Sequence, residues 1–195
     1  MSRLTIDDIL DLREYERIRE DFRAEIIQLK RLRRIPLGEI ITLLFESEAT
    51  IKFQIQEMAR AEKMISDEAI SVELETYNPL IPSPNQLTAT VFVELTSKGD
   101  LMYWLPRLVG IERSFKLNIG GGRYEVRAAP EADHESQLTR QDITSAVHYI
   151  AFDLTEEQSK AFANSQVVLE VDHPEYRATT ELSPAFRASI VADWT

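Results

Sequence analysis

The sequence predicts an α+β fold, in which a helical N-terminal half packs on a mostly antiparallel β-sheet. Apolar residues recur at three- and four-residue intervals through much of residues 1–78, which is the spacing of amphipathic helices. Residues 85–195 instead carry alternating and β-branched apolar runs separated by turn residues, which is typical of strands. The loop 79–84, which is rich in proline, separates the two parts. We expect one domain over residues 1–195, because this length suffices for one substantial core.

The composition narrows the class of protein. The net charge is -11, and the chain contains no cysteine, which excludes disulfides, thiolate metal sites and cysteine nucleophiles. The acidic excess lies entirely beyond residue 34, so the body of the protein is unsuited to binding a phosphate backbone. Acidic residues stand where a signal peptide would be apolar, and no apolar run is long enough to span a bilayer. We therefore expect a cytoplasmic protein that binds neither nucleic acid nor membrane.

The first helices are predicted from caps and periodicity. Thr5 and Asp8 form a capping pattern for a short helix that ends near Leu12. Residues 13–34 carry apolar side chains at helical spacing, and we expect this helix to end before Pro36.

Two further helices are predicted after a short apolar segment. Residues 39–45 have the length of a buried strand, although periodicity alone also permits a helix. Ser47 can cap a helix over 48–64. Its first part also alternates as a strand would, but the helix formers that follow favour a helix. Another helix is expected over 67–77, ending at Asn78 and the proline that follows it.

The second half is predicted to contain strands joined by turns and short helices. A triple-glycine turn at 120–122 indicates a hairpin. We expect strands at 87–95, 114–119, 123–128, 144–154, 166–172 and 176–182, helices at 101–109 and 155–164 and from Ser183 onward, and an acidic mobile loop at 130–141 that contains His134.

Two histidines in the β half form the first candidate site. His148 lies within one predicted strand and His173 at the end of another, so they could converge if these strands are neighbours. With Asp172, or with a carboxylate from the 48–64 helix (Glu57 or Glu62), they would make a two-histidine, one-carboxylate site for iron, manganese or zinc. The alternative is that His148 is a strand residue that bonds to the backbone, and that His173 helps to shape a turn. No E-x-x-H or H-E-x-x-H motif supports the metal site.

The same helix has a second interpretation. Glu57, Arg60 and Glu62 lie near Gln54 and Gln56, and together they could form a buried ion-pair network. Alternatively, one carboxylate could have a raised pKa and act as a general base. Glu112 and Arg113 offer the same two alternatives at a helix-to-strand junction.

A basic cluster closes the 13–34 helix. Its members are Lys30, Arg31, Arg33 and Arg34. Cations at this position complement the helix dipole, and they could also form a docking surface for an acidic partner. No phosphate-binding loop, nucleophile elbow or dinucleotide fingerprint is present, so no motif specifies a reaction or a cofactor.

Several ordered segments resemble a bacterial family known as domain of unknown function 3501. They are residues 44–46, 53–58, 60–62, 77–79, 108–113, 144–149 and 171–174. The resemblance covers nearly the whole chain from Leu4 onward. It implies a role near rubrerythrin-like di-iron proteins and iron–sulfur oxidoreductases, which are often encoded beside members of this family.

Two functions are therefore expected as alternatives. The first is an accessory or binding protein that docks onto a redox or peroxide-defence partner through the basic cluster. The second is a metal-binding protein or enzyme that uses His148 and His173 with Glu57 or Glu62.

Overall fold

The computed structural model describes residues 3–131 and 142–194. Residues 132–141, which include His134 and most of the predicted acidic loop, lie outside the described residues. Among the described residues, no helix combines the length and the apolar character needed to cross a membrane.

Helices dominate the first part of the chain. In order, the elements are η1 (Ile6–Asp8), α1 (Leu12–Arg33), β1 (Arg34–Leu37), β2 (Ile41–Phe45), α2 (Glu48–Glu62), α3 (Asp67–Tyr77) and η2 (Asn78–Leu80). Side chains cap the three α-helices: Ser47 caps α2, as the sequence predicts, Ser66 caps α3 and Asp11 caps α1.

Strands dominate the second part. The elements are β3 (Gln86–Val93), α4 (Lys98–Trp104), η3 (Ile111–Arg113), β4 (Phe115–Ile119), β5 (Tyr124–Arg127), β6 (Ala129–Pro130), β7 (Val147–Asp153), α6 (Glu156–Asn164), β8 (Val167–His173), β9 (Tyr176–Glu181), α7 (Pro184–Val191) and η4 (Ala192–Trp194). The α+β prediction is confirmed.

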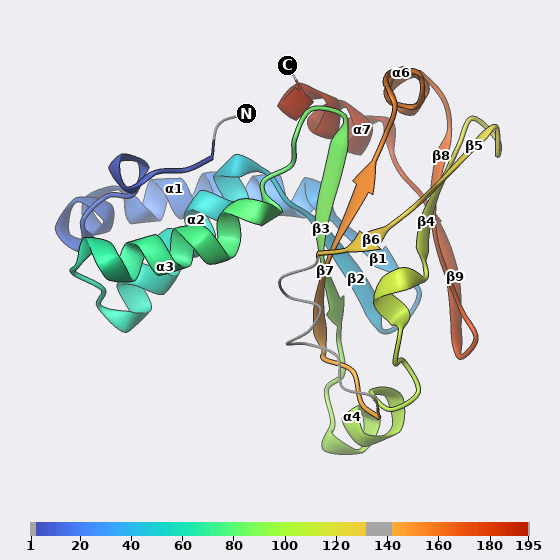
Figure 1. The fold of residues 1–195 in the computed structure, drawn as a ribbon, viewed down its shortest axis with the longest axis horizontal. Helices are drawn as coiled ribbons and strands as arrows, with labels where there is room; N and C mark the ends of the chain where they lie inside the picture. Colours follow the sequence, from blue (N-terminus) through green and yellow to red (C-terminus); the bar gives the residue numbers. More distant parts are fainter. Residues whose placement is uncertain (1–2, 132–141, 195) are drawn as a thin grey trace.

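The strands form two antiparallel sheets. Sheet A has the order β1-β2-β3-β7-β6, and sheet B has the order β5-β4-β8-β9. Helices α1, α2 and α3 extend to one side of the sheets, whereas α6 and α7 lie at one end of them (Figure 1). The chain passes from sheet B to sheet A between β5 and β6, where the Ala128 amide donates to the Phe115 carbonyl at 2.9 Å.

Side chains join the other edges of the two sheets. The Tyr176 hydroxyl of β9 donates to the Leu37 carbonyl of β1 at 2.8 Å and accepts from the Ile40 amide at 3.3 Å. The Thr180 hydroxyl donates to the Pro36 carbonyl at 3.0 Å. These bonds tie β1 to β9 without a continuous strand ladder.

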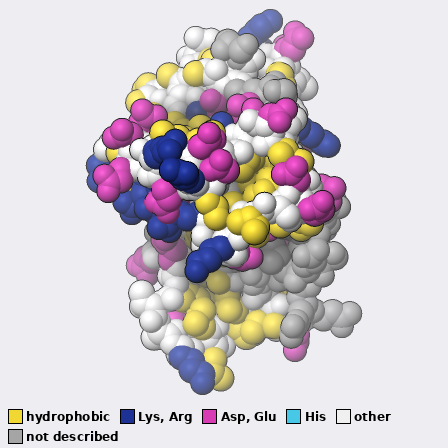
Figure 2. All heavy atoms as spheres, turned by 90° about the vertical axis from the view of Figure 1, so that its left-hand side faces the viewer, with side chains coloured by type: hydrophobic (Ala, Val, Ile, Leu, Met, Phe, Trp, Pro, Cys, Tyr) yellow, Lys and Arg dark blue, Asp and Glu magenta, His cyan; other side chains and the backbone are white. Residues whose placement is uncertain are grey.

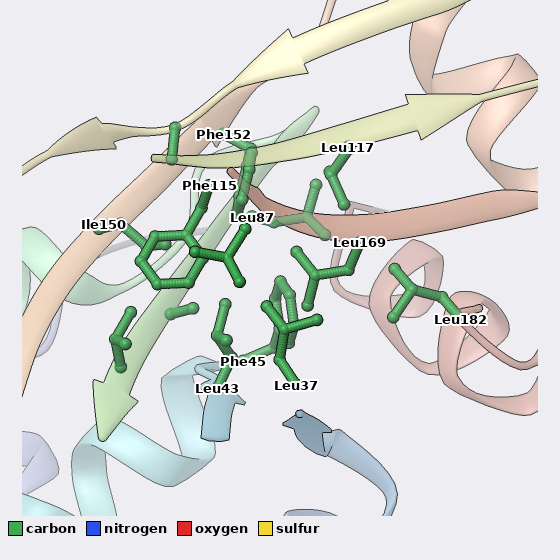
Figure 3. Close-up of a cluster of buried hydrophobic side chains, with 14 of the residues drawn as sticks. Leu37, Leu43, Phe45, Leu87, Phe115, Leu117, Ile150, Phe152, Leu169 and Leu182 are labelled. Carbon is green, nitrogen blue, oxygen red and sulfur yellow. The ribbon is translucent and has the colours of Figure 1, made fainter. Parts of the chain in front are cut away.

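The main hydrophobic core lies between the two sheets. Figure 3 shows leucine, isoleucine and phenylalanine side chains of both sheets converging there, among them Phe45, Phe115 and Phe152. On β3, the alternate residues from Leu87 to Val93 face this core, as the alternation in the sequence predicts. A smaller cluster, which includes Ile51, Ile55 and Leu74, packs α2 and α3 on the outer face of sheet A.

Three elements differ from the sequence predictions. Residues 34–37 form a strand where only a helix end was expected; Pro36 is tolerated because β1 is an edge strand and needs no amide there. Helix α4 begins before residue 101, because Ser97 caps it, and ends at Trp104. Residues 129–130 pair with β7 rather than belonging to a loop.

Candidate functional site

The outer face of sheet A provides one wall of the candidate site. Leu44, Thr90 and Tyr149 are neighbours across β2, β3 and β7, and Phe92 and Val147 form the next row. Because successive strand residues point to opposite faces, these side chains face away from the main core and towards the helices.

Helices provide the opposite wall. Lys30 of α1, Ile51 and Gln54 of α2 and Tyr77 at the end of α3 face the strand residues across a cavity of about 210 Å³. The cavity therefore lies where the helical part meets sheet A, and it is lined by both apolar and polar side chains.

Glu46 lies on the wall of this cavity, between β2 and α2. It is two residues beyond Leu44, so it continues the outward-facing side of β2, and its amide donates to the Thr88 carbonyl at 2.9 Å. Glu46 is only 7% exposed. Its Oε1 accepts from the Thr90 hydroxyl at 2.6 Å, and its Oε2 lies 2.5 Å from the Thr50 hydroxyl.

Burial raises the pKa of Glu46 above its usual value of 4.5. The hydrogen bonds from Thr50 and Thr90, followed by the charges of Lys30 and Arg33, act in the opposite direction but do not offset the burial. The carboxyl group is therefore more readily protonated than an exposed glutamate.

The Thr50 hydroxyl joins Glu46 to the first turn of α2. It donates to Glu46 Oε2 at 2.5 Å and accepts from the Ser47 amide at 2.8 Å. The Ser47 carbonyl lies 3.0 Å from the Thr50 hydroxyl and also accepts from the Ile51 amide at 3.0 Å. These contacts hold the Glu46 carboxyl group in place on the cavity wall.

Two tyrosines share the cavity. Burial raises the pKa of Tyr149 to about 12, and the nearby Tyr77 and Glu46 add to the effect. Burial also raises the pKa of Tyr77, while a hydrogen bond with Gln54 opposes the change. Both phenols are therefore neutral at neutral pH and can donate hydrogen bonds.

Lys30 is the one basic residue that lines the cavity. Its ammonium lies 5.2 Å from the centroid of the Phe53 ring, a cation–π contact. Lys30 forms no ion pair with any residue of the described ranges 3–131 and 142–194. It therefore brings a positive charge to a cavity whose single carboxyl group, Glu46, has a pKa raised by burial.

Arg33 lies close by but has a structural role. Its side chain is 2% exposed, and it donates to Asp193 at 2.5 Å, to the Ser189 hydroxyl at 2.8 Å and to the Glu46 carbonyl at 3.2 Å. It also donates to the Ser189 carbonyl. Arg33 thereby joins α1 to α7 and to the segment that bears Glu46, and Asp193 neutralises its charge.

The predicted histidine site is not assembled. His148 lies on β7 of sheet A and His173 on β8 of sheet B, so their strands are not neighbours. His148 Nε2 lies 2.9 Å from the Ser145 carbonyl and 3.0 Å from the Thr144 hydroxyl, and burial lowers the pKa of its imidazole. His173 Nε2 lies 3.1 Å from the Val109 carbonyl. His148 thus bonds to the backbone, as the alternative expected, and His173 Nδ1 accepts from the Glu175 amide at 3.3 Å in the turn between β8 and β9.

The predicted carboxylates do not join the histidines. Glu57 accepts from the Arg19 guanidinium through both oxygens, at 2.8 Å each, and from the Tyr15 hydroxyl at 2.7 Å. The bonds from Arg19 lower the pKa of Glu57 to about 2, so it is no general base. Glu62 is exposed at the end of α2. Within the described residues, no group of three or more histidine, aspartate and glutamate side chains could hold a metal ion.

The predicted polar network on α2 also differs from expectation. Glu57 and Arg60 pair with α1 instead of with each other, since Arg60 bonds to Glu16 at 2.5 Å. Gln56 is the fully buried polar residue, and its amide holds the Leu10 backbone through two hydrogen bonds. Glu112, the other predicted candidate, is buried, and its Oε2 has no hydrogen-bond partner among the described residues.

The basic cluster divides among different environments. Lys30 lines the cavity, and Arg33 is buried. Arg34 pairs with Glu94, and its guanidinium carbon lies 5.1 Å from the centroid of the Phe92 ring. Arg31 is exposed. Figure 2 shows basic and acidic side chains interspersed over the helical end of the molecule, with hydrophobic side chains between them. The four cations therefore do not form one continuous docking surface.

The sequence reasoning missed the cavity residues. Glu46, Tyr77 and Tyr149 were noted only as parts of the family resemblance, and none was a site candidate. One available signal was the position of Glu46, a charged residue that directly follows an apolar strand and precedes the helix cap Ser47.

Comparisons with known proteins give a family and a fold. The family described as a protein of unknown function (DUF3501) matches residues 3–194. A crystal structure of a protein of unknown function from Burkholderia pseudomallei K96243 is similar to this chain, with a TM-score of 0.90 and 33% sequence identity over 100% of both chains. The search of curated proteins found no match.

Proposed function

We propose that this chain, which belongs to the DUF3501 family of proteins of unknown function, is a binding protein for a small molecule. The binding site is the cavity between sheet A and helices α1, α2 and α3. Glu46, Tyr77 and Tyr149 contact the ligand as hydrogen-bond donors, and the apolar residues of the wall enclose the rest of it.

The observation that carries this proposal is Glu46, a buried carboxyl group on the wall of a cavity, whose pKa burial raises. Burying a carboxyl group costs free energy, and a fold seldom places one at such a position for stability alone. Few polar groups converging in a largely apolar pocket are characteristic of small-molecule sites. A neutral carboxylic acid can also donate a hydrogen bond at neutral pH, which a carboxylate cannot.

The size of the cavity limits the ligand. Its volume of about 210 Å³ is below the ~300–1,000 Å³ of pockets that hold drug-sized molecules. The ligand is therefore a compact molecule with one polar end and a short apolar body.

A cavity-filling variant tests the proposal. Val147 lines the cavity, whereas Val168 is a half-buried valine on the outer face of sheet B. Small fragments should shift the NMR signals of Tyr77 and Tyr149 in the wild-type protein and in Val168→Trp, but not in Val147→Trp. Fragment binding that persists in Val147→Trp, or a complete absence of binding at these tyrosines in the wild type, would contradict the proposal.

Docking onto a rubrerythrin-like or iron–sulfur partner, which the resemblance implies, stays a separate prediction. Arg31 is exposed and makes no ion pair with another described residue, so it is the member of the basic cluster that could contact such a partner. Arg31→Glu should then weaken co-purification with the oxidoreductase, and unchanged co-purification would remove the basic cluster from the hypothesis.

A further inference from the structure

We infer that the ligand of this cavity is a small organic anion, whose charged oxygen binds Lys30 and the hydroxyl groups of Tyr77 and Tyr149. This inference rests on the proposed binding function and names the class of ligand. A monocarboxylate with a short hydrocarbon body has the required chemistry.

The charges around the cavity favour an anion. Lys30 is the one basic residue that lines it, and Glu46, whose pKa burial raises, is the one carboxyl group. The charge of Arg33 is neutralised by Asp193 at 2.5 Å. No carboxylate of the described residues forms an ion pair with Lys30, so its ammonium group can pair with an anion in the cavity. A bound anion would form a charge-assisted hydrogen bond with Lys30, and such bonds are stronger than those between neutral groups.

The remaining polar groups suit the same ligand. Two phenols and the Gln54 amide can all donate hydrogen bonds, and an anionic oxygen accepts several at once. A cationic ligand would find only neutral acceptors and would face Lys30. The apolar side chains of the wall, which are Leu44, Ile51, Leu80, Phe92 and Val147, suit a hydrocarbon body.

Binding of an anion should be linked to the proton on Glu46. The groups that surround this carboxyl are Lys30 and Arg33 from α1, Thr50 from α2, Thr90 from β3 and Tyr149 from β7. Tyr77 from α3 shares the cavity, and Glu62 and Glu73 lie close enough to affect Tyr77. If Glu46 ionised, its charge would cancel that of Lys30 and repel the ligand. Affinity for an anion should therefore fall as pH rises through the pKa of Glu46 in the folded protein.

Matched probes test the inference. Benzoate, benzamide and benzylamine have similar shapes but carry an anionic, a neutral and a cationic group, and acetate with acetamide gives a smaller pair. We expect the carboxylates to bind in the cavity more tightly than the amides, as measured by NMR titration of Tyr77 and Tyr149. Lys30→Gln should weaken carboxylate binding by roughly tenfold or more, and should not weaken amide binding.

Two further variants separate charge at the cavity from charge elsewhere. Lys63 is exposed at the end of α2, so Lys63→Gln should leave carboxylate affinity unchanged. Glu46→Gln should remove the dependence of carboxylate affinity on pH, because the amide cannot ionise.

The outcomes distinguish the inference from the proposed function. Amides that bind in the cavity as tightly as carboxylates, with no effect of Lys30→Gln, would overturn the anion inference and leave the binding function standing. The same holds if benzylamine is the tightest ligand. If no probe of any charge perturbs the cavity residues in the wild-type protein, the inference and the proposed function are both overturned.

Discussion

Thr50 Oγ1 lies 2.5 Å from Glu46 Oε2, and this contact links the first turn of helix α2 to the end of strand β2. The Thr90 hydroxyl contacts the other carboxyl oxygen at 2.6 Å, so the buried side chain is held from α2 and from β3. Its pKa is raised by burial, against the effect of these two hydrogen bonds.

Replacing Glu46 with glutamine should make the free energy of unfolding less dependent on pH. The unfolded chain loses the Glu46 proton near pH 4.5, whereas the native protein holds it to a higher pH. Native stability therefore falls as pH rises between these two values, by at most about 1.4 kcal/mol per pH unit. The difference in free energy of unfolding between Glu46→Gln and wild type should be constant below pH 4.5. Above pH 4.5 it should change in favour of the variant.

Chemical denaturation at several pH values measures this difference. Glu68→Gln, at an exposed position on α3, is the matched control and should not show the same trend. A stability difference for Glu46→Gln that stays constant across the whole pH range would contradict a raised pKa.

Removing the Thr50 hydroxyl should destabilise the protein. Thr50→Val leaves the Glu46 carboxyl group and the Ser47 amide without their partner in a buried site. A buried polar group without a partner costs about 1–3 kcal/mol. Thr50→Ser keeps the hydroxyl and should lose less stability than Thr50→Val. The control Thr76→Val, on an exposed part of α3, should change stability by less than about 0.5 kcal/mol. Equal losses for the Val and Ser variants at position 50 would show that the hydroxyl is not responsible.

Arg33 and Arg31 should respond very differently to substitution. Arg33→Met leaves Asp193 unpaired and frees the Ser189 carbonyl, so we expect a loss of about 3–5 kcal/mol in urea denaturation. Arg31→Met, two residues earlier on the same helix, should change stability by less than about 0.5 kcal/mol. Similar losses for the two variants would be incompatible with a buried bridge between α1 and α7.

The Arg19–Glu57 pair should contribute stability that acid removes. The pKa of Glu57 is about 2 in the folded protein and near 4.5 in the unfolded chain. Between these values the unfolded state binds more protons, so the contribution is complete above pH 4.5 and is lost as pH falls towards 2. Glu57→Gln should therefore be less stable than wild type at pH 7, and the difference should shrink in acid. A difference that persists at pH 2 would argue against the ion pair.

Gly38 should tolerate alanine less well than Gly121 does. Both have positive φ, of 77° and 68°, so alanine strains both positions by about 1–2 kcal/mol. A Cβ atom at position 38 would also collide with the Tyr176 hydroxyl, whereas one at position 121 meets no atom within 4 Å. Thermal unfolding should show a larger loss for Gly38→Ala. Equal losses would mean that Tyr176 of β9 moves away from the added methyl group at position 38 without a loss of stability.

Local signals in the sequence predicted most of the fold. Capping residues and periodicity placed α2 and α3, and the alternation from Leu87 onward placed β3 with the correct face inward. Strand β1 was missed because its pairing with β2 is a tertiary contact, and because Pro36 is a helix terminator that an edge strand also accepts. Whether the chain is one cooperative domain stays a prediction.

The candidate site was far less accessible from the sequence. The sequence candidates, such as His148 and Glu57, were side chains that can bind a metal or a proton. In the structure both form hydrogen bonds with nearby groups instead. The cavity instead combines Lys30 of α1, Glu46 of the β2–α2 connection, Tyr77 of α3 and Tyr149 of β7. Their convergence depends on the packing of helices on the outer face of sheet A, and no local sequence pattern encodes that packing.

The protonation state of Glu46 is the claim on which the proposed site depends. Its pKa can be measured directly by following the side-chain carboxyl carbon of Glu46 by NMR as a function of pH, with Glu46→Gln to assign the signal. We predict a pKa clearly above the usual value of 4.5 in the ligand-free protein. A pKa below neutral pH would show that Glu46 is ionised in a neutral solution, and would contradict both the neutral donor and the positive cavity.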